Sequence, residues 1–120
     1  MNVLIVLVKL ELGAIWRRAL ERQGAKVSLV ASEVEAIELL AQQKFDVIVL
    51  DVVLDKGSAF AVSDYTNYKY PNARVVFVTN TSFFSDGSIF QHCSNACAFV
   101  PTATPPEDLA AMVEHHADVN

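Results

Sequence analysis

The sequence predicts an α/β fold in which a doubly wound, five-stranded parallel sheet lies between two layers of helices. Short apolar runs alternate along the chain with segments whose apolar residues recur at spacings of three and four, as expected when strands alternate with helices. Short connections allow few topologies, since each crossover between parallel strands is right-handed. Hydrophobic residues make up 52% of the 120 residues and charged residues 19%, a balance that supports a large core. We therefore expect one domain spanning residues 1–120.

Five apolar runs are predicted to form the strands. Each run is rich in the β-branched and aromatic residues that strands favour. The runs cover residues 3–8, 26–30, 45–50, 74–79 and 96–100.

The first helix is predicted between the first two strands by a stripe of apolar residues on one helical face. The stripe consists of Leu12, Ile15, Trp16, Ala19 and Leu20. Gly24 then favours the end of the helix.

The second helix has a clear start signal. Ser32 and Glu35 form a capping box, in which each side chain can satisfy the other's backbone amide. We expect this helix to bury Ile37 and Leu40 and to end near Lys44.

The last helix is predicted to begin within residues 104–107, TPPE, because proline in a first turn lacks an amide that would have no partner there. Leu109, Met112 and Val113 should face inward. The third and fourth helices, within residues 58–70 and 82–95, are less regular. The former carries three tyrosines and poor helix formers, and Asp86 and Gly87 interrupt the latter.

Charge and motifs exclude several classes of function. The net charge of -5 gives no general attraction to nucleic acid or to anionic membranes. The first apolar run is too short to span a bilayer and lacks the features of a signal peptide, so we expect a soluble, cytoplasmic protein. The sequence contains no GxSxG, P-loop or GxGxxG motif, and we expect no enzymatic activity.

Asp51 is the leading candidate for a functional residue. It follows the strongest predicted strand, FDVIVLD, and functional groups of doubly wound sheets collect beyond the carboxyl ends of the strands. A carboxylate has few structural reasons to follow so apolar a run. The alternative is that Asp51 caps the following loop by accepting backbone N–H groups.

Three segments extend this observation to a family. FDVIVLDVVLDKGSAF, VVFVTNTS and AFVPTATPPEDL resemble the third, fourth and fifth strands of response-regulator receiver domains, and the resemblance covers essentially the whole chain. It implies a flavodoxin-like fold and a role in a two-component phosphorelay. Asp51 matches the aspartate that accepts phosphate from a histidine kinase. Thr79 matches the switch hydroxyl and Phe99 the switch aromatic residue.

The chain departs from the family at the pocket. Leu7 and Val8 stand where receivers carry two acidic residues that hold Mg²⁺, and Thr102 replaces the family's lysine. Mg²⁺ prefers an octahedron of oxygen ligands and is reluctant to dehydrate. We therefore expect very weak Mg²⁺ binding and no other cofactor.

Lys9 lies just beyond the end of the first strand. Its flexible stem could place the ammonium group beside Asp51, where an ion pair would replace the metal. The alternative is that Lys9 points to solvent. Without an acidic cluster, Asp51 should ionise more readily, unless burial opposes this.

Two functions remain open from the sequence. The chain is either a phosphorelay receiver with Asp51 as phosphoacceptor or a pseudo-receiver that binds proteins irrespective of phosphate. Six aromatic residues could contribute a binding surface, with about half in the core: Tyr65, Tyr68, Tyr70, Phe83, Phe84 and Phe90. The expected partners are a histidine kinase, a phosphotransfer protein or a downstream target, and we expect a monomer or weak homodimer. No output domain follows Asn120, so signals should pass by binding another protein, unless part of the chain is absent.

Overall fold

The computed structural model describes residues 1–54, 57–79 and 96–118. The elements are β1 (Asn2–Val6), α1 (Leu10–Arg22), β2 (Lys26–Val30), α2 (Glu33–Gln42), β3 (Val47–Asp51), α3 (Ala59–Lys69), β4 (Arg74–Thr79), β5 (Ala96–Pro101) and α5 (Pro106–Asp118). The fourth predicted helix lies outside the described residues, as do Phe83, Phe84 and Phe90.

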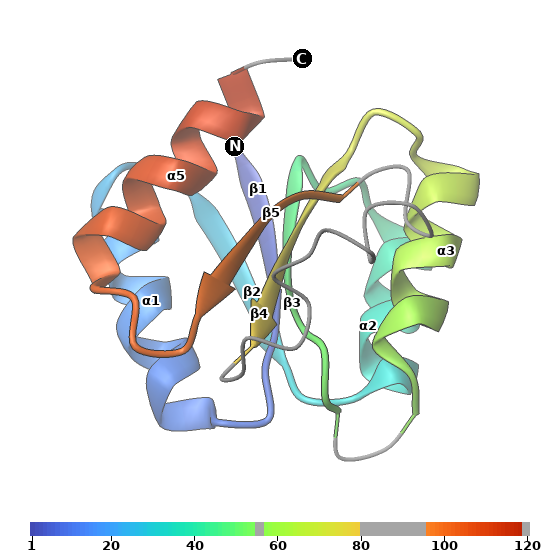
Figure 1. The fold of residues 1–120 in the computed structure, drawn as a ribbon. Helices are drawn as coiled ribbons and strands as arrows, with labels where there is room; N and C mark the ends of the chain where they lie inside the picture. The colour runs from blue at the N-terminus through green and yellow to red at the C-terminus, as the bar shows by residue number, and fades with distance from the viewer. Residues whose placement is uncertain (55–56, 80–95, 119–120) are drawn as a thin grey trace.

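All five strands are parallel and follow the order β2-β1-β3-β4-β5. Helices α1 and α5 cover one face of the sheet, and α2 and α3 cover the other (Figure 1). This is the predicted three-layer, doubly wound fold. Because the chain reverses its direction of winding after β2, the ends of β1 and β3 lie beside each other at the switch in strand order.

The strand boundaries agree with the sequence to within two residues. The second and fourth strands match their predicted ranges, whereas β1 ends at Val6 and β3 begins at Val47. Leu7 and Val8 continue the apolar run beyond β1, although the Leu7 backbone N–H still donates to Val30 O at 3.0 Å. Asp51 is the last residue of β3.

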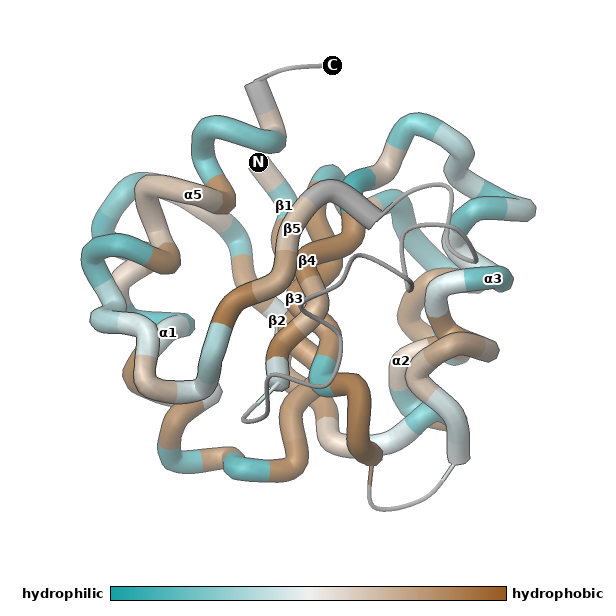
Figure 2. Tube along the Cα trace, viewed as in Figure 1, coloured by the Kyte–Doolittle hydropathy of each residue, from teal (hydrophilic) through white to brown (hydrophobic). Residues whose placement is uncertain are grey.

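The core consists of two hydrophobic clusters, one on each face of the sheet. Successive β1 side chains alternate between them, as the twofold repeat of a strand requires. Val3 and Ile5 pack with the α1 and α5 side chains, whereas Leu4 and Val6 pack with those of α2 and α3. Figure 2 shows hydrophobic residues concentrated along the central strands. The strands are therefore apolar on both faces.

Helix α1 confirms most of its predicted stripe, with one error. Trp16, Ala19 and Leu20 are buried, but Ile15 is 47% exposed. Its position lies at the edge of the stripe. The Trp16 indole N–H donates to the backbone O of Thr104 at 3.3 Å, which joins α1 to the segment before α5.

Helix α2 begins with the predicted cap. The Glu35 backbone N–H donates to Ser32 Oγ at 3.3 Å. The Glu35 carboxylate accepts from the Ala31 backbone N–H and the Ser32 hydroxyl, so the reciprocal half involves Ala31 rather than the Ser32 amide. Leu40 is buried, whereas Ile37 is only half-buried.

Helix α3 forms where the sequence gave weak signals. Val62 and Thr66 are fully buried, and the Thr66 hydroxyl donates to Val62 O at 2.8 Å, which satisfies a polar group inside the core. The Tyr70 hydroxyl, just past the helix, donates to Leu40 O at 2.9 Å. Contacts with α2 and the sheet therefore compensate for poor helix propensity.

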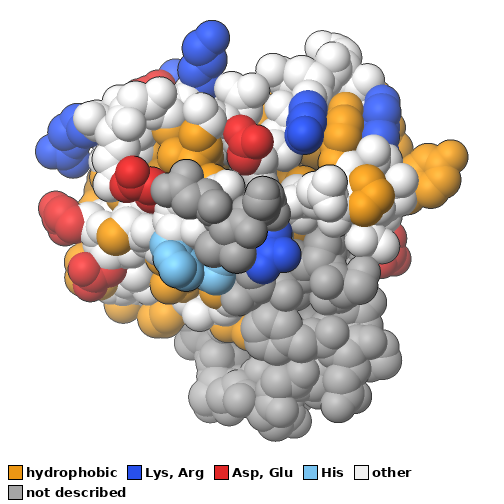
Figure 3. All heavy atoms as spheres, turned by 90° about the horizontal axis from the view of Figure 1, so that it is seen from above, with side chains coloured by type: hydrophobic (Ala, Val, Ile, Leu, Met, Phe, Trp, Pro, Cys, Tyr) orange, Lys and Arg blue, Asp and Glu red, His pale blue; other side chains and the backbone are white. Residues whose placement is uncertain are grey.

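Helix α5 places Leu109 and Val113 in the core, with Met112 half-buried against it. This confirms the predicted inward face. No helix within the described ranges is long and apolar enough to cross a membrane. Basic and acidic side chains are interspersed on the face shown in Figure 3, which lies opposite the carboxyl ends of the strands.

Candidate functional site at the carboxyl ends of the strands

The carboxyl ends of β3, β4 and β5 bring three predicted site residues to one edge of the sheet. Asp51 ends β3 opposite Val78, and Thr79 ends β4 opposite Pro101. The Thr102 backbone N–H donates to Thr79 O at 3.2 Å, which extends the pairing past β5. The parallel pairing thus places Asp51, Thr79 and Thr102 near one another at the same edge of the sheet.

A pocket of about 460 Å³ opens at this edge. Aliphatic residues make up half of the described lining, together with one aspartate, one lysine and two threonines. The described lining residues are Val8, Lys9, Asp51, Val52, Val53, Leu54, Thr79 and Thr102. The pocket therefore unites five of the seven residues singled out in the sequence.

Asp51 is half-buried in this pocket. Its Oδ1 accepts a hydrogen bond from the Val53 backbone N–H at 3.1 Å, the contact expected if Asp51 caps the following loop. Burial raises the pKa of the Asp51 carboxyl above its ordinary value of 3.8, while the backbone N–H groups of Val53 and Val8 and the charge of Lys9 oppose this increase. Burial thus outweighs the absence of acidic neighbours.

Lys9 does not form the ion pair that one sequence hypothesis required. It is exposed and occupies the N-cap position of α1. The ion pair within 4.0 Å in the described part of the chain joins Arg17 and Glu21. The Lys9 ammonium acts on Asp51 only through its longer-range field, so the hypothesis that Lys9 points to solvent is the one that agrees with the structure.

Leu7 and Val8 occupy different environments, although both stand at acidic positions of the family. Leu7 is fully buried in the core cluster beneath α1 and α5. Its side chain is not among those that line the open pocket. Val8 is 38% exposed and lines the pocket beside Asp51.

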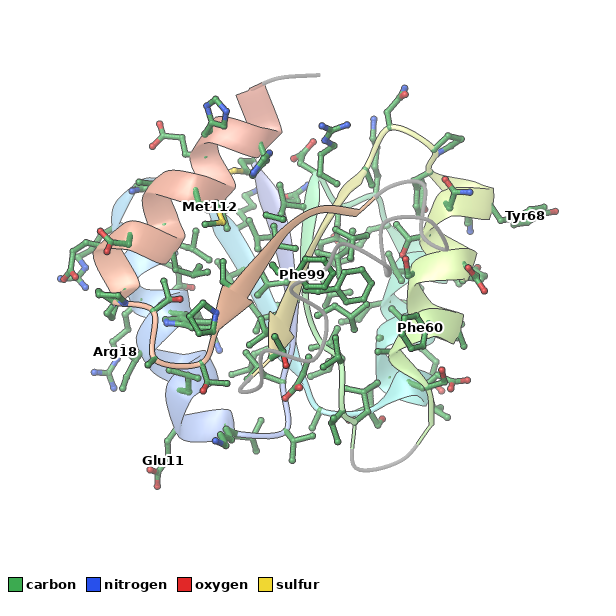
Figure 4. All side chains as sticks on the ribbon, viewed as in Figure 1. Glu11, Arg18, Phe60, Tyr68, Phe99 and Met112 are labelled. Carbon is green, nitrogen blue, oxygen red and sulfur yellow. The ribbon has the colours of Figure 1, made fainter. Side chains whose placement is uncertain are left out.

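Phe99 lies on β5 and faces the layer formed by α2 and α3 (Figure 4). Its ring stacks on Phe77 with centroids 5.7 Å apart and an angle of 25° between the planes. The Phe77 ring in turn lies beside the ring of Phe60, near the start of α3, with centroids 6.2 Å apart. The candidate switch residue is thus one end of a row of three rings that leads from β5 to α3.

The pocket offers few ligands for a metal ion. Asp51 supplies the one carboxylate among the described lining residues. No three His, Cys, Asp or Glu side chains gather closely enough to hold a metal within residues 1–54, 57–79 and 96–118. A single carboxylate and two hydroxyls are a poor match for the hard octahedral environment of Mg²⁺.

Val52, Val53 and Leu54 also line the pocket, although no sequence pattern had singled them out. Their signal is the continuation of apolar residues past Asp51 into a segment that leaves the sheet. Val53 is 71% exposed, which a residue serving only the core would not be. These residues give the pocket an apolar wall.

The chain belongs to the response regulator receiver domain family, whose model matches residues 3–114. The fold and the position of Asp51 at the end of β3 agree with this assignment. Receiver domains of two-component systems are generally non-enzymatic signalling modules that interact with kinases, phosphotransfer proteins or effector domains. No sequence among the curated proteins matches the chain.

Solved structures show the same fold at low sequence identity. A response regulator receiver domain protein (CheY-like) from Methanospirillum hungatei JF-1 has a TM-score of 0.88 and 18% identity, over 98% of this chain and 94% of that one. The receiver domain of NtrX from Brucella abortus gives 0.87 and 15%, over 98% and 99%. A Burkholderia pseudomallei response regulator with a phosphorylated aspartic acid, calcium ion and citrate gives 0.81 and 22%, over 98% and 69%.

Proposed function

We propose that this receiver domain signals by binding other proteins and that Mg²⁺-dependent phosphorylation of Asp51 is very slow or absent. One observation carries the proposal: the two positions that hold acidic residues in receivers are a core leucine, Leu7, and an apolar wall residue, Val8. Asp51 is left without a second described carboxylate in the pocket. Mg²⁺ should therefore bind very weakly, because it needs several oxygen ligands to offset its dehydration.

The charge on a transferring phosphoryl group also lacks compensation. Phosphoryl transfer depends on positioning and on cations that neutralise the equatorial oxygens. Thr102, with a neutral side chain, stands at the family's lysine position and lines the pocket, and Lys9 is exposed. The proposed site keeps the acceptor carboxylate and lacks most of the groups that would activate it.

Protein binding has support from the surface of the described residues. Leu10, Val53 and Tyr68 are 54%, 71% and 85% exposed, and Tyr68 projects away from α3 in Figure 4. Exposed aliphatic and aromatic side chains are typical of contact surfaces. A kinase, a phosphotransfer protein or a downstream target is the proposed partner, with a cytoplasmic domain that acts as a monomer or weak homodimer.

A second candidate function is that of a phosphorelay receiver with Asp51 as phosphoacceptor and Thr79 and Phe99 as the switch pair. The observation that favours it is the position of Asp51, which opens into the same pocket as Thr79. This function requires phosphoryl transfer to proceed without the acidic pair.

Treatment with acetyl phosphate and Mg²⁺ followed by intact mass measurement separates the two functions. The comparison protein carries Val8→Asp and Thr102→Lys, which restore a ligand and a cation at positions that line the pocket. Leu7 is left unchanged, because a carboxylate at this buried core position would destabilise the fold. Adding Asp51→Asn to the restored protein identifies the labelled residue.

We expect the unmodified chain to remain unlabelled under conditions in which the restored protein gains one phosphoryl group. The label should disappear with Asp51→Asn. Labelling of the unmodified chain at a rate similar to that of the restored protein would instead establish the phosphorelay function.

A further inference from the structure

The Asp51 carboxylate has an exposed approach and no close cation in the described part of the chain. Its Oδ1 accepts a hydrogen bond from the Val53 backbone N–H, the Val8 backbone N–H also acts on the carboxylate, and no described Lys, Arg or His nitrogen lies within 4.0 Å of it. A carboxylate has about four acceptor positions. The pocket therefore retains capacity for a hydrogen-bonded cation from outside the domain.

The walls of the pocket are apolar around this charge. Val8, Val53 and Leu54 supply aliphatic surface, and Thr79 and Thr102 also line the pocket. A volume of about 460 Å³ has room for a long side chain. A ligand that suits such a pocket has an apolar stem and a cationic head.

We propose that the pocket binds an arginine side chain presented by a partner protein. This inference rests on the proposed function and names the partner's chemistry at the same site. A guanidinium group donates in a planar fork that matches a carboxylate, and it is hydrated more weakly than an ammonium ion or Mg²⁺. One carboxylate is enough for it, whereas Mg²⁺ requires more ligands.

The surroundings of the pocket favour a protein rather than a free small cation as the source. Val8 and Val53, which line the pocket, are 38% and 71% exposed. A polypeptide that continues from the bound arginine would cover this apolar rim. A free guanidinium compound would leave it in water, at a cost in affinity.

Lys9 opposes the binding of a cation. Lys9 is one of the residues at the pocket, and the charge of its ammonium group acts on Asp51. Because Lys9 is exposed, water and salt weaken this repulsion. Removal of the Lys9 side chain should therefore strengthen the binding of a guanidinium group. Most substitutions that remove a side chain from a binding site weaken binding, so an increase in affinity would be specific to the loss of this repulsion.

The test is an NMR titration of the whole chain at fixed ionic strength, followed by the Asp51 carboxyl carbon and the Val8 and Val53 methyl groups. The probes are butylguanidinium and butan-1-ol, which share the apolar stem and differ in the charged head. A second pair, acetyl-Leu-Arg-Leu-amide and acetyl-Leu-Gln-Leu-amide, presents the head on a polypeptide. The variants are Asp51→Asn and Lys9→Ala. The control is Asp64→Asn, which changes an exposed carboxylate on α3.

We expect butylguanidinium to bind in preference to butan-1-ol, and the arginine peptide to bind more tightly than butylguanidinium. Asp51→Asn should weaken guanidinium binding by about tenfold or more, and Lys9→Ala should strengthen it by about twofold to fivefold. Asp64→Asn should leave it unchanged. If Asp51→Asn perturbs the fold, the affinity of Lys9→Ala still tests the proposal, provided that the NMR spectrum of Lys9→Ala is that of a folded protein.

Equal binding of butylguanidinium and butan-1-ol, or an unchanged affinity in Asp51→Asn, would overturn this inference. An arginine peptide that binds no better than butylguanidinium would overturn the assignment to a partner protein. These failures are distinct from failure of the proposed function, which the acetyl phosphate experiment alone detects. If the chain is not phosphorylated and also does not bind guanidinium, only the present inference is contradicted.

Discussion

Glu33, in the first turn of α2, accepts a hydrogen bond through Oε1 from the Ser58 backbone N–H at 2.6 Å. The two residues are 25 positions apart in the chain. Ser58 precedes α3, and Asp51 and Val53 lie at the other end of the same β3–α3 connection. One carboxylate thus fixes the far end of the segment that begins with the candidate acceptor.

Replacement of Glu33 by alanine should destabilise the domain by about 1 kcal/mol, because the Ser58 N–H loses its partner. Glu33→Gln keeps an acceptor oxygen and should cost less. Glu38→Ala, on the exposed side of the same helix, is the control for helix propensity. Urea unfolding measures all three, and equal effects of Glu33→Ala and Glu38→Ala would show that the hydrogen bond contributes nothing.

Gly57 and Gly24 form a matched pair, since both have positive φ, +92° and +90°. A Cβ at Gly57 would lie 2.5 Å from Glu33 Cβ, whereas a Cβ at Gly24 would meet nothing within 4 Å. Each alanine replacement should cost about 1–2 kcal/mol of backbone strain. Gly57→Ala should cost more because Glu33 must also move, and comparison of the two unfolding free energies checks this. A smaller cost at Gly57 would contradict the close approach.

Tyr70→Phe should destabilise the domain by about 1 kcal/mol through loss of the hydrogen bond to Leu40 O at 2.9 Å. Tyr68 is 85% exposed, so Tyr68→Phe should change stability by less than about 0.5 kcal/mol. Thermal unfolding of both proteins measures the difference. Similar melting temperatures would mean that water replaces Leu40 O as partner at little cost.

The stability of the domain should depend on the ionisation of Asp51. Burial raises the pKa of this carboxyl in the folded state, so the folded protein binds the proton more tightly than the unfolded chain does. The free energy of unfolding contributed by Asp51 therefore rises as the pH falls from above the folded pKa toward the ordinary value of 3.8. Below both values the contribution no longer changes.

Asp51→Asn removes this cost of ionisation and keeps an oxygen that can accept from the Val53 N–H. The variant should be more stable than the unmodified protein at neutral pH, and the difference should shrink as the pH falls through the same interval. Urea unfolding of both proteins across pH 3–7 cancels the contributions of other groups. A difference that is constant with pH would show that Asp51 titrates alike in both states.

The three layers follow from patterns that the sequence contains, whereas several contacts of the site do not. The limits of β2 and β4 were predicted because turn or polar residues border them. The first run continued apolar through Leu7 and Val8, so hydrophobicity alone did not mark where β1 pairing stops. Helix propensity underestimated α3, because its stability comes from the contacts of Val62 and Thr66 with the core.

The site residues that end a strand could be predicted from the sequence, whereas the placement of a side chain beyond a strand end, such as that of Lys9, could not. Asp51 and Thr79 end their strands, so their meeting at one edge followed from parallel pairing. The register of Lys9 was ambiguous, and a long flexible side chain has no preferred direction in the sequence. The Glu33–Ser58 contact depends on the packing of α2 beside the loop before α3, which no local pattern encodes.

An NMR titration with Mg²⁺ measures whether one carboxylate in an apolar pocket can hold this ion well. The signals of the Asp51 carboxyl and the Val8 position are followed in the unmodified protein and in Val8→Asp. We expect no saturable change below about 10 mM in the unmodified protein and at least about tenfold tighter binding after the second carboxylate is added. Saturable binding in the unmodified protein with an affinity equal to that of Val8→Asp would show that the pocket holds Mg²⁺ without the acidic pair.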